Sequence, residues 1–286
     1  MKKLSLILSI SIFLLNVSLA QSSVWKIERK GNTVYIGGTM HLLTPEDHPL
    51  PPEFDSAYVW SEALVFEADI KKMENPAVIQ QMMLLAMYQD DRTLESELSE
   101  EAYALLESEC SKIDLSLSDF TKFKPAMVML IYTVTKLQES GLTEAGVDPY
   151  YYEKALADNK ESLFLETVES QLKLLFGDEG EDWDQAVFQF FDDQEKMEKM
   201  GEDIKDSWRS GKSKLFIRIQ KQMKKEYPEI YMKVLVNRNN KWISQISSYF
   251  DSESVEFVLV GALHLHGPDG ILNLLKESGY SISQLE

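Results

Sequence analysis

Short apolar runs, each just long enough for a buried strand, constrain the fold of this chain more than any other feature. Three of them read EALVFEAD, ESLFLE and SVEFVLVG, and each ends in a small or acidic residue. Long stretches with the apolar spacing of helices separate them. Buried strands that alternate with helices are typical of α/β proteins. The sequence therefore predicts a single α/β domain, with a mixed central β-sheet, helices on both faces and a large helical insertion.

Turn and capping residues place further elements around these runs. The segment VWKIERKGNTVYIGG alternates apolar and polar residues about a turn at residues 30–32, which favours a β-hairpin. A helix is predicted from Pro52 to Ser61, because proline is tolerated in a first helical turn. Helical spacing extends over residues 75–137 and returns over Tyr231–Tyr249. The final SISQL is predicted to add an edge strand.

The first residues have the three parts of a secretory signal. Two lysines precede an apolar run, and Ser18 and Ala20 are small residues at the positions that a signal peptidase reads. The apolar run is shorter than the roughly 20 residues that a membrane-spanning helix needs. We therefore expect residues 1–20 to be a signal peptide and residues 21–286 to form the mature domain, with no transmembrane span. The mature protein is expected to be periplasmic or secreted.

The composition narrows the expected partners. Asp and Glu together number 47 against 29 Lys and Arg, which gives a net charge of -18. A surface of this sign repels phosphate backbones, so nucleic acid is not an expected partner. Cys110 is the single cysteine. No internal disulfide can form, and stability must therefore come from the burial of a core.

One spacing, Gly-x-x-His, occurs twice in a chain that has four histidines. The copies run from Gly38 to His41 and from Gly261 to His264, and each follows an apolar run. In open α/β sheets, ligands bind beyond the carboxyl ends of the strands. Both histidines are therefore expected at one edge of the sheet. The other two, His48 and His266, are candidates for a lid or for orienting a ligand.

Two carboxylates share this position at the ends of apolar runs. Glu67 and Glu166 each follow such a run. His41, Glu67 and His264 together offer two imidazoles and one carboxylate, a set that holds a catalytic divalent metal and leaves a place for water. These ligands suit zinc, manganese and cobalt alike. The alternative is that both histidines only cap strand ends through hydrogen bonds.

Six segments, in order along the chain, match the motifs of a known family. They are GGTMHLL at 37–43, LPPEFDSAYVWSEALVFEAD at 50–69, GVD at 146–148, FLETVESQLKLL at 164–175, LVNRNNKW at 235–242 and VLVGALHLHGPDGILNLLKESGYSISQL at 258–285. Together they resemble the TraB/GumN family, which is related to the Tiki proteases, and they cover essentially the whole expected mature chain.

The resemblance implies an exported protein of α/β type. Tiki members are described as metal-dependent proteases built on two Gly-x-x-His motifs and a glutamate. By position these residues correspond to His41, Glu67 and His264. The family's Arg-Asn pair corresponds to Arg238 and Asn239, which the resemblance therefore places in the site.

The resemblance also suggests roles for the remaining polar residues. Glu166 and Glu169 match the family's Leu-Glu-Thr-x-Glu segment. One of them is expected to accept a proton from metal-bound water, or either can orient a ligand histidine. Arg238 is expected to hold a substrate carboxylate or to stabilise an oxyanion. The alternative for Arg238 is a buried ion pair with Glu67 or Glu166.

Three functions stay open from the sequence. The first is an exported metal-dependent hydrolase, a peptidase in particular, that activates water at the two-His, one-Glu site. The second is a protein that binds or sequesters a peptide signal without cleaving it. The third is a metal-free esterase with His41 as general base, because the wider superfamily resembles the erythromycin esterases. The expected substrate is a peptide or a small molecule, and the sequence gives no oligomeric state.

Overall fold

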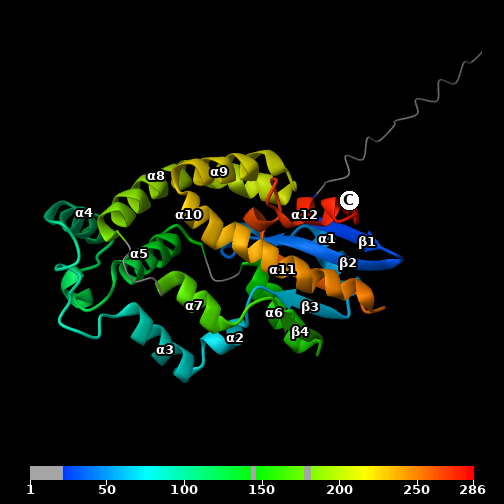
Figure 1. Ribbon diagram of the computed structural model, residues 1–286, viewed down its shortest axis with the longest axis horizontal. Coiled ribbons are helices and arrows are strands. Elements are labelled where there is room, and N and C mark those ends of the chain that lie inside the picture. Colours follow the sequence, from blue (N-terminus) through cyan, green and yellow to red (C-terminus); the bar gives the residue numbers. More distant parts are fainter. Residues whose placement is uncertain (1–21, 143–145, 177–181) are drawn as a thin grey trace, which may run out of the picture.

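A six-stranded mixed β-sheet organises one half of the molecule, on the right in Figure 1. The computed structural model describes residues 22–142, 146–176 and 182–286, and the predicted signal peptide lies outside these residues. The strand order is β4-β3-β5-β2-β1-β6. The strands are β1 (Val24–Arg29), β2 (Asn32–Thr39), β3 (Ala63–Phe66), β4 (Glu161–Phe164), β5 (Glu256–Gly261) and β6 (Ser281–Gln284).

Strand direction divides the sheet into two parts. β2, β5, β3 and β4 are parallel neighbours, whereas β1 pairs antiparallel with both β2 and β6. The predicted hairpin is confirmed: Arg29 pairs with Asn32, and Lys30 and Gly31 have φ values of 52° and 90°. Two positive φ values in a two-residue loop match the right-handed twist of the flanking strands. The predicted edge strand at the carboxyl end is also confirmed, as β6.

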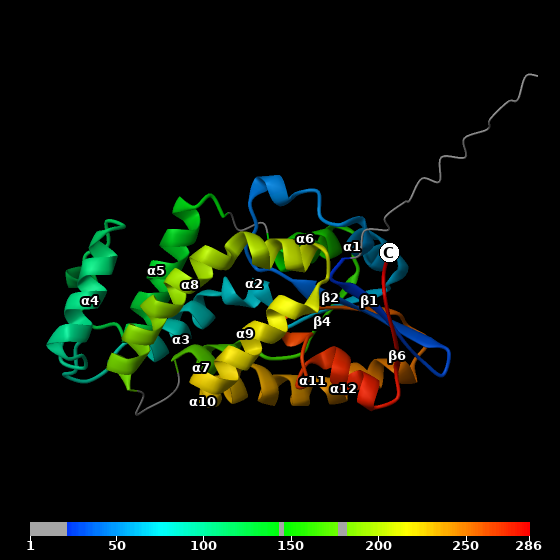
Figure 2. The same cartoon turned by 90° about the horizontal axis from the view of Figure 1, so that it is seen from above.

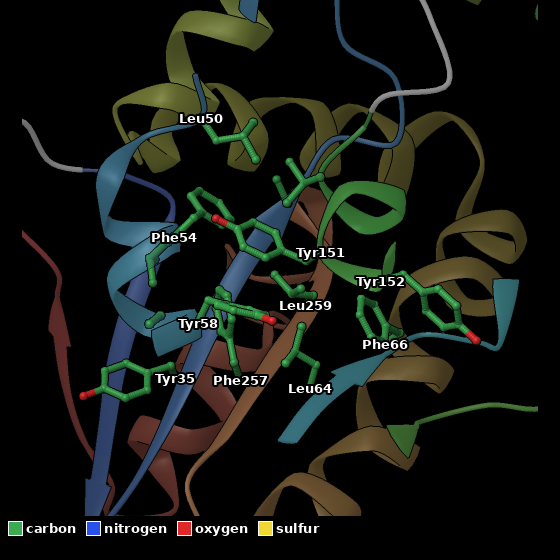
Figure 3. Packing of buried hydrophobic residues seen from close by; sticks show 14 of the residues in the cluster. Tyr35, Leu50, Phe54, Tyr58, Leu64, Phe66, Tyr151, Tyr152, Phe257 and Leu259 are labelled. Carbon is green, nitrogen blue, oxygen red and sulfur yellow. The ribbon is translucent and has the colours of Figure 1, made fainter. Parts of the chain in front are cut away.

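Helices cover both faces of the sheet, as predicted (Figure 2). One face packs against α1 (Pro52–Trp60), α6 (Val147–Ala157) and parts of α8 (Trp183–Arg209) and α9 (Ser213–Glu226). Figure 3 shows this packing, in which Phe54 and Tyr151 meet Phe257 of β5. The other face packs against α11 (Asn237–Ser248) and α12 (Ile271–Glu277). The central strands are therefore buried on both sides, which explains their uninterrupted apolar runs.

The helical insertion extends the molecule away from the sheet (Figure 1). It comprises α2 (Ile70–Met73), α3 (Pro76–Ala86), α4 (Glu100–Ser111), α5 (Pro125–Glu139), α7 (Val168–Phe176) and much of α8. A separate apolar cluster, which includes Leu106, Val128 and Val187, holds α4, α5 and α8 together. At its other end α8 buries Trp208, whose Nε1 donates to the Gly38 carbonyl at 2.6 Å. One continuous helix thus joins the insertion to the end of β2.

Two predicted elements differ in detail from the structure. The helix predicted over Tyr231–Tyr249 is divided into α10 (Pro228–Tyr231), a π-helical turn at Met232–Val236, α11, and a 3-10 turn at Tyr249–Asp251. The helical stretch after residue 75 is interrupted by a further 3-10 turn at Leu117–Phe120. Two more 3-10 turns lie at Pro45–Asp47 and Ala262–His264. Across the described residues, every helix is too short or too polar to span a bilayer.

Candidate functional site

The carboxyl ends of the parallel strands bring the predicted side chains to one edge of the sheet. His41, Glu67, Glu166 and His264 follow β2, β3, β4 and β5, respectively. The clearest measure of their convergence is the space beside Gly261. A Cβ atom on this glycine would lie 3.4 Å from Glu67 Oε1, 3.6 Å from His264 Cδ2 and 3.8 Å from His41 Nε2. Both Gly-x-x-His motifs and Glu67 therefore face one small volume.

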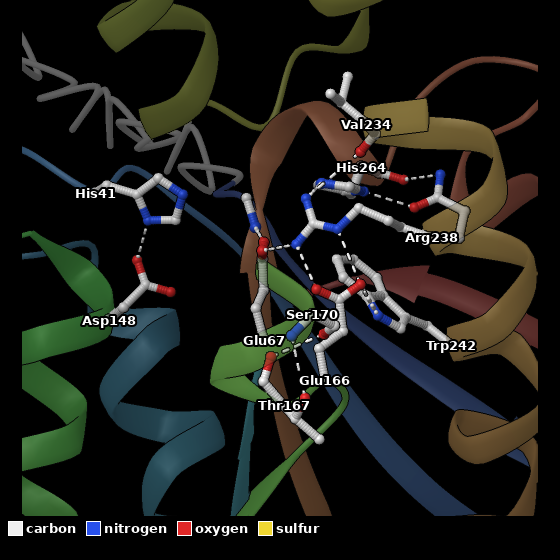
Figure 4. Close-up of polar contacts among 12 residues, drawn as sticks. His41, Glu67, Asp148, Glu166, Thr167, Ser170, Val234, Arg238, Trp242 and His264 are labelled. Atoms are coloured by element: carbon white, nitrogen blue, oxygen red, sulfur yellow. Dashed lines mark hydrogen bonds and ion pairs between the residues drawn. The ribbon is translucent and has the colours of Figure 1, made fainter. Parts of the chain in front are cut away.

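His264 is held in one tautomer by its neighbours (Figure 4). Its Nδ1 lies 2.6 Å from Asn239 Oδ1, which can only accept, so Nδ1 carries the proton and donates. Nε2 then has a lone pair and accepts from Arg238 Nη1 at 3.2 Å. Burial lowers the pKa of His264 to about 4, which keeps the ring neutral at pH 7. Asn239 also donates to the His264 carbonyl, at 3.2 Å, and so fixes both ends of this residue.

Arg238 links the two carboxylates of the site. Its Nη2 donates to Glu67 Oε2 at 2.5 Å, and its Nε donates to Glu166 Oε1 at 2.9 Å. Nη2 also reaches Glu166 Oε2 at 3.2 Å. Trp242 supports the pair, because its Nε1 donates to Glu166 at 3.1 Å and its ring lies 4.6 Å from the guanidinium carbon. Arg238 thus forms the buried ion pair that the sequence left as an alternative role, with both glutamates at once.

Glu67 is ionised despite its position between the strand ends. Burial opposes ionisation, but His264, Arg238 and His41 lower the pKa of Glu67 to about 2. The backbone N–H of Gly261 donates to Oε1 at 2.8 Å and acts in the same direction. Oε2 takes the Arg238 contact, so each carboxylate oxygen has a donor. The charge stays on Glu67 throughout the physiological pH range.

His41 has a partner that the sequence did not single out as a site residue. Its Nδ1 lies 2.9 Å from Oδ2 of Asp148, the second residue of α6. The attraction of Asp148 raises the pKa of His41 to about 9. The histidine side chain is 67% exposed, whereas that of Asp148 is 9% exposed. The buried carboxylate, drawn beside His41 in Figure 4, therefore fixes a ring that otherwise faces solvent. His41 Nε2 is left on the side of Gly261, 3.8 Å from the place of an added Cβ atom.

Backbone contacts place Asp148 beside His41. The Val147 N–H donates to the Met40 carbonyl at 3.0 Å. Gly146 lies so close to this loop that an added Cβ would be 2.0 Å from the His41 carbonyl oxygen. Only glycine permits this approach. The Gly-Val-Asp segment is one of the motifs that resemble the family, but nothing in the sequence indicates that its aspartate contacts His41.

The remaining candidates, Glu169, His48 and His266, have their described contacts outside the cluster around Gly261. Glu169 is exposed in the first turn of α7, where contacts with its own backbone amide and Thr167 lower its pKa. His48 lies in the loop before α1 with its ring 5.6 Å from that of Tyr150. His266 is buried between Trp25 and Phe216 and packs as part of the core. Trp242 was not singled out from the sequence, because a tryptophan on an amphipathic helix carries no sign of its polar partner.

The donor groups around Gly261 suit a divalent cation. Both histidines engage Nδ1 with an oxygen partner, as metal-binding histidines do. His41 Nε2 and the Cδ2 edge of the His264 ring face the volume beside Gly261. A carboxylate oxygen of Glu67 faces it as well. At present Arg238 donates to His264 Nε2 and to Glu67. Among the described residues, no three His, Cys, Asp or Glu side chains are already drawn together tightly enough to hold a metal ion. The donors fit a metal once Arg238 withdraws from them.

Fold and site together define an α/β protein with a histidine- and carboxylate-lined site at the carboxyl ends of its parallel strands. The family model described as the TraB/PrgY/gumN family matches residues 23–284. The chain therefore belongs to the TraB/PrgY/gumN family, in agreement with the resemblance of its motifs. Searches of curated proteins and of solved structures returned no match.

Proposed function

We propose that this protein is an exported metal-dependent hydrolase that cleaves peptides. His41, Glu67 and His264 would hold the metal, which can be zinc, manganese or cobalt. When bound, a divalent cation at such a site polarises a carbonyl group and lowers the pKa of a coordinated water. Export follows from the predicted signal peptide, and the mature protein would act in the periplasm or outside the cell.

One observation carries this proposal. His41 Nε2, Glu67 Oε1 and the His264 ring all lie within 3.8 Å of one point beside Gly261. They come from three different strand ends, and each histidine is oriented by a separate oxygen partner. Histidines that only cap strand ends would not need to meet a carboxylate at one point, whereas metal ligation brings such side chains together.

The surrounding residues suit the other tasks of a hydrolase. Arg238 has a guanidinium that can move from Glu67 and His264 to a developing oxyanion while Glu166 retains Nε. Glu166 Oε2 makes the longer of the two contacts with Arg238 and is the oxygen available to accept a proton. Asn239 and Asp148 orient the two histidines. Glu169 has its described contacts within its own turn, so Glu166 is preferred as the base.

A binding protein without catalysis is the second candidate. The hydrogen bonds from Arg238 to His264 Nε2 and Glu67 Oε2 favour it, because they use atoms that a metal would need. A metal-free esterase suits the geometry less well. With a pKa of about 9, His41 carries a proton at neutral pH and cannot act as a base there.

The test is elemental analysis of the purified mature protein after incubation with zinc, manganese or cobalt and dialysis against metal-free buffer. We expect about one metal ion per chain in the parent and none in His41→Ala or His264→Ala, because each loses one of three ligands. His48→Ala is the matched control and should retain the metal. Metal in both site variants would contradict the proposed ligand set. Absence of metal from the parent would leave the binding protein as the better description.

A further inference from the structure

A large cavity lies away from the strand-end cluster, between α5, α8, α9 and α10. Its volume is about 950 Å³. The apolar part of its lining comes from four helices and includes Met129, Phe190, Ile219, Met223 and Ile230. Ile230 is 40% exposed, so part of the apolar wall faces solvent. A cavity of this size accommodates several side chains of a ligand.

The polar part of the lining is strongly acidic. Among the described residues that line the cavity, four are acidic (Asp182, Asp193, Glu226 and Glu229), and Lys196 is the basic one. Lys196 is already paired, because its Nζ lies 2.6 Å from Asp192 and 3.4 Å from Asp193. Glu226 accepts from the neutral amide of Gln222 at 3.0 Å. In the part of the chain that the structure describes, no ion pair involves Glu226 or Glu229, so a cationic ligand could pair with both carboxylates.

The cavity and the candidate site border a common apolar cluster. Met223 lines the cavity and packs against a small apolar cluster that includes Leu235, Val234 and Leu263. The Val234 carbonyl accepts from Arg238 Nη1 at 3.4 Å, and Leu263 directly precedes His264. A ligand seated in the cavity would thus contact Met223, which packs against the turn directly before the helix that carries Arg238.

We propose that this cavity binds a cationic amphipathic peptide segment, which forms the part of the substrate remote from the bond that is cleaved. The substrate assignment rests on the proposed hydrolase function, whereas the binding does not. Leucine-like side chains of the segment would occupy the apolar wall, where methionines adapt to varied shapes. Its lysine or arginine side chains would pair with Glu226 and Glu229. The same charges would repel an acidic peptide.

The experiment measures fluorescence anisotropy of a short labelled peptide that alternates leucine with lysine, with the full mature chain in EDTA so that no cleavage occurs. The test variant is Glu226→Lys combined with Glu229→Lys. The matched control is Glu100→Lys combined with Glu101→Lys, which makes the same charge change on exposed residues of α4. We expect the test variant to weaken binding by about tenfold or more and the control to leave it nearly unchanged.

A second variant addresses the apolar wall. Ile230→Ser removes an exposed apolar side chain without a charge change and should also weaken binding, by roughly threefold to tenfold. Circular dichroism melting curves establish that each variant is folded. Equal weakening in the test and control variants would overturn the proposal, because binding would then follow net charge alone. Equal binding of a matched peptide with glutamate in place of lysine would also overturn it.

The experiments distinguish failure of the proposed hydrolase function from failure of the cavity assignment. If the protein binds the cationic peptide but takes up no metal, the hydrolase proposal falls and the cavity assignment stands. If the metal-loaded protein cleaves peptides with no preference for a cationic segment, the hydrolase proposal stands and the assignment of the substrate to this cavity falls. Each result therefore decides one of the two.

Discussion

The two histidines of the site have opposite electrostatic surroundings although each follows its glycine by the same spacing. Asp148 raises the pKa of His41 to about 9, whereas burial lowers that of His264 to about 4. At neutral pH the metal-free site thus contains one imidazolium and one neutral imidazole. Metal binding would release the His41 proton, so affinity should increase as the pH rises toward 9.

At the residue scale we predict that Asp148 is the main cause of the raised pKa of His41. In the metal-free protein, NMR should show the His41 ring titrating near 9, and Asp148→Asn should return it toward its ordinary value of 6.5. Asp55→Asn, which removes a carboxylate paired with Lys154 instead, should leave it unchanged. A His41 pKa that stays near 9 in Asp148→Asn would refute the assignment.

The raised pKa of His41 also makes the stability of the fold depend on pH. The pKa of His41 is higher in the folded protein than in the unfolded chain, so protonated His41 stabilises the fold fully below about pH 6.5. That contribution is lost as the pH rises through about 9. Because the side chain is 67% exposed, water screens the pair and the contribution is small.

The residues of the site were predictable to different degrees. His41, Glu67, Glu166 and His264 follow apolar runs, so the strand-end rule placed them together from the sequence alone. Asp148 follows no strand: it starts a helix that docks onto the His41 loop by backbone contact. Periodicity carries no information about such a contact between segments more than a hundred residues apart.

Among the elements, the ends of β2 and β5 differ in how much space surrounds their glycines. A Cβ on Gly38 would lie 2.9 Å from Leu265 Cδ1 and 3.2 Å from the Ala262 Cα. A Cβ on Gly261 would meet nothing closer than 3.4 Å, the distance to Glu67 Oε1. The first glycine is needed for packing between the strand ends, whereas the second keeps the candidate metal volume open.

Alanine substitutions should separate these two roles. Gly38→Ala overpacks the strand ends and should lower the free energy of unfolding by about 1–3 kcal/mol. Gly261→Ala should fold normally but lose metal uptake, because its methyl group fills the space between the ligands. Gly201→Ala, in the middle of α8 with open space around it, is the control and should stabilise by up to about 1 kcal/mol. Urea unfolding and elemental analysis together measure both effects, and full metal uptake by Gly261→Ala would contradict the proposed site.

The elements themselves were largely predictable from the sequence. Strand length and helical spacing placed the sheet, and the helix predicted from Pro52 to Ser61 is observed as Pro52–Trp60. The π-helical turn at Met232–Val236 was not predicted. A π-helical turn contains one more residue than an α-helical turn, and the apolar spacing of a short segment does not reveal this difference. Such turns are frequent at functional sites. Here the turn directly precedes the helix that carries Arg238 and Asn239.

At the scale of the whole molecule, α8 contributes to two apolar clusters, one in the insertion and one beside the sheet. Its first half contributes Val187 to the cluster of the insertion, and Trp208 near its other end is buried beside the sheet. Among the described residues, the members of the insertion cluster come from helices and loops, whereas the cluster beside the sheet includes strand residues. We therefore expect the two parts to open with different free energies.

Hydrogen exchange can test this expectation. Leu106→Ala removes a fully buried side chain from the insertion cluster, a change that costs about 2–5 kcal/mol where a site cannot collapse. Mass spectrometry should show faster exchange in α4 and α5 and little change in β5. Leu259→Ala, equally buried but in β5, should speed exchange in every element. Acceleration of β5 by Leu106→Ala to the same extent as α4 would mean that the chain unfolds as one unit.

The backbone contact between Gly146 and His41 has a consequence for how the site can change. This contact makes His41 and Asp148 one structural unit, formed by the loop after β2 and the start of α6. Arg238, Asn239 and His264 form a second structural unit with its own hydrogen bonds. Among the described residues, no hydrogen bond joins the two units, so we expect that either can be exchanged as a unit for its counterpart in a relative. Chimaeras that keep residues 146–148 with His41 would then combine two independently built half-sites around the same Glu67.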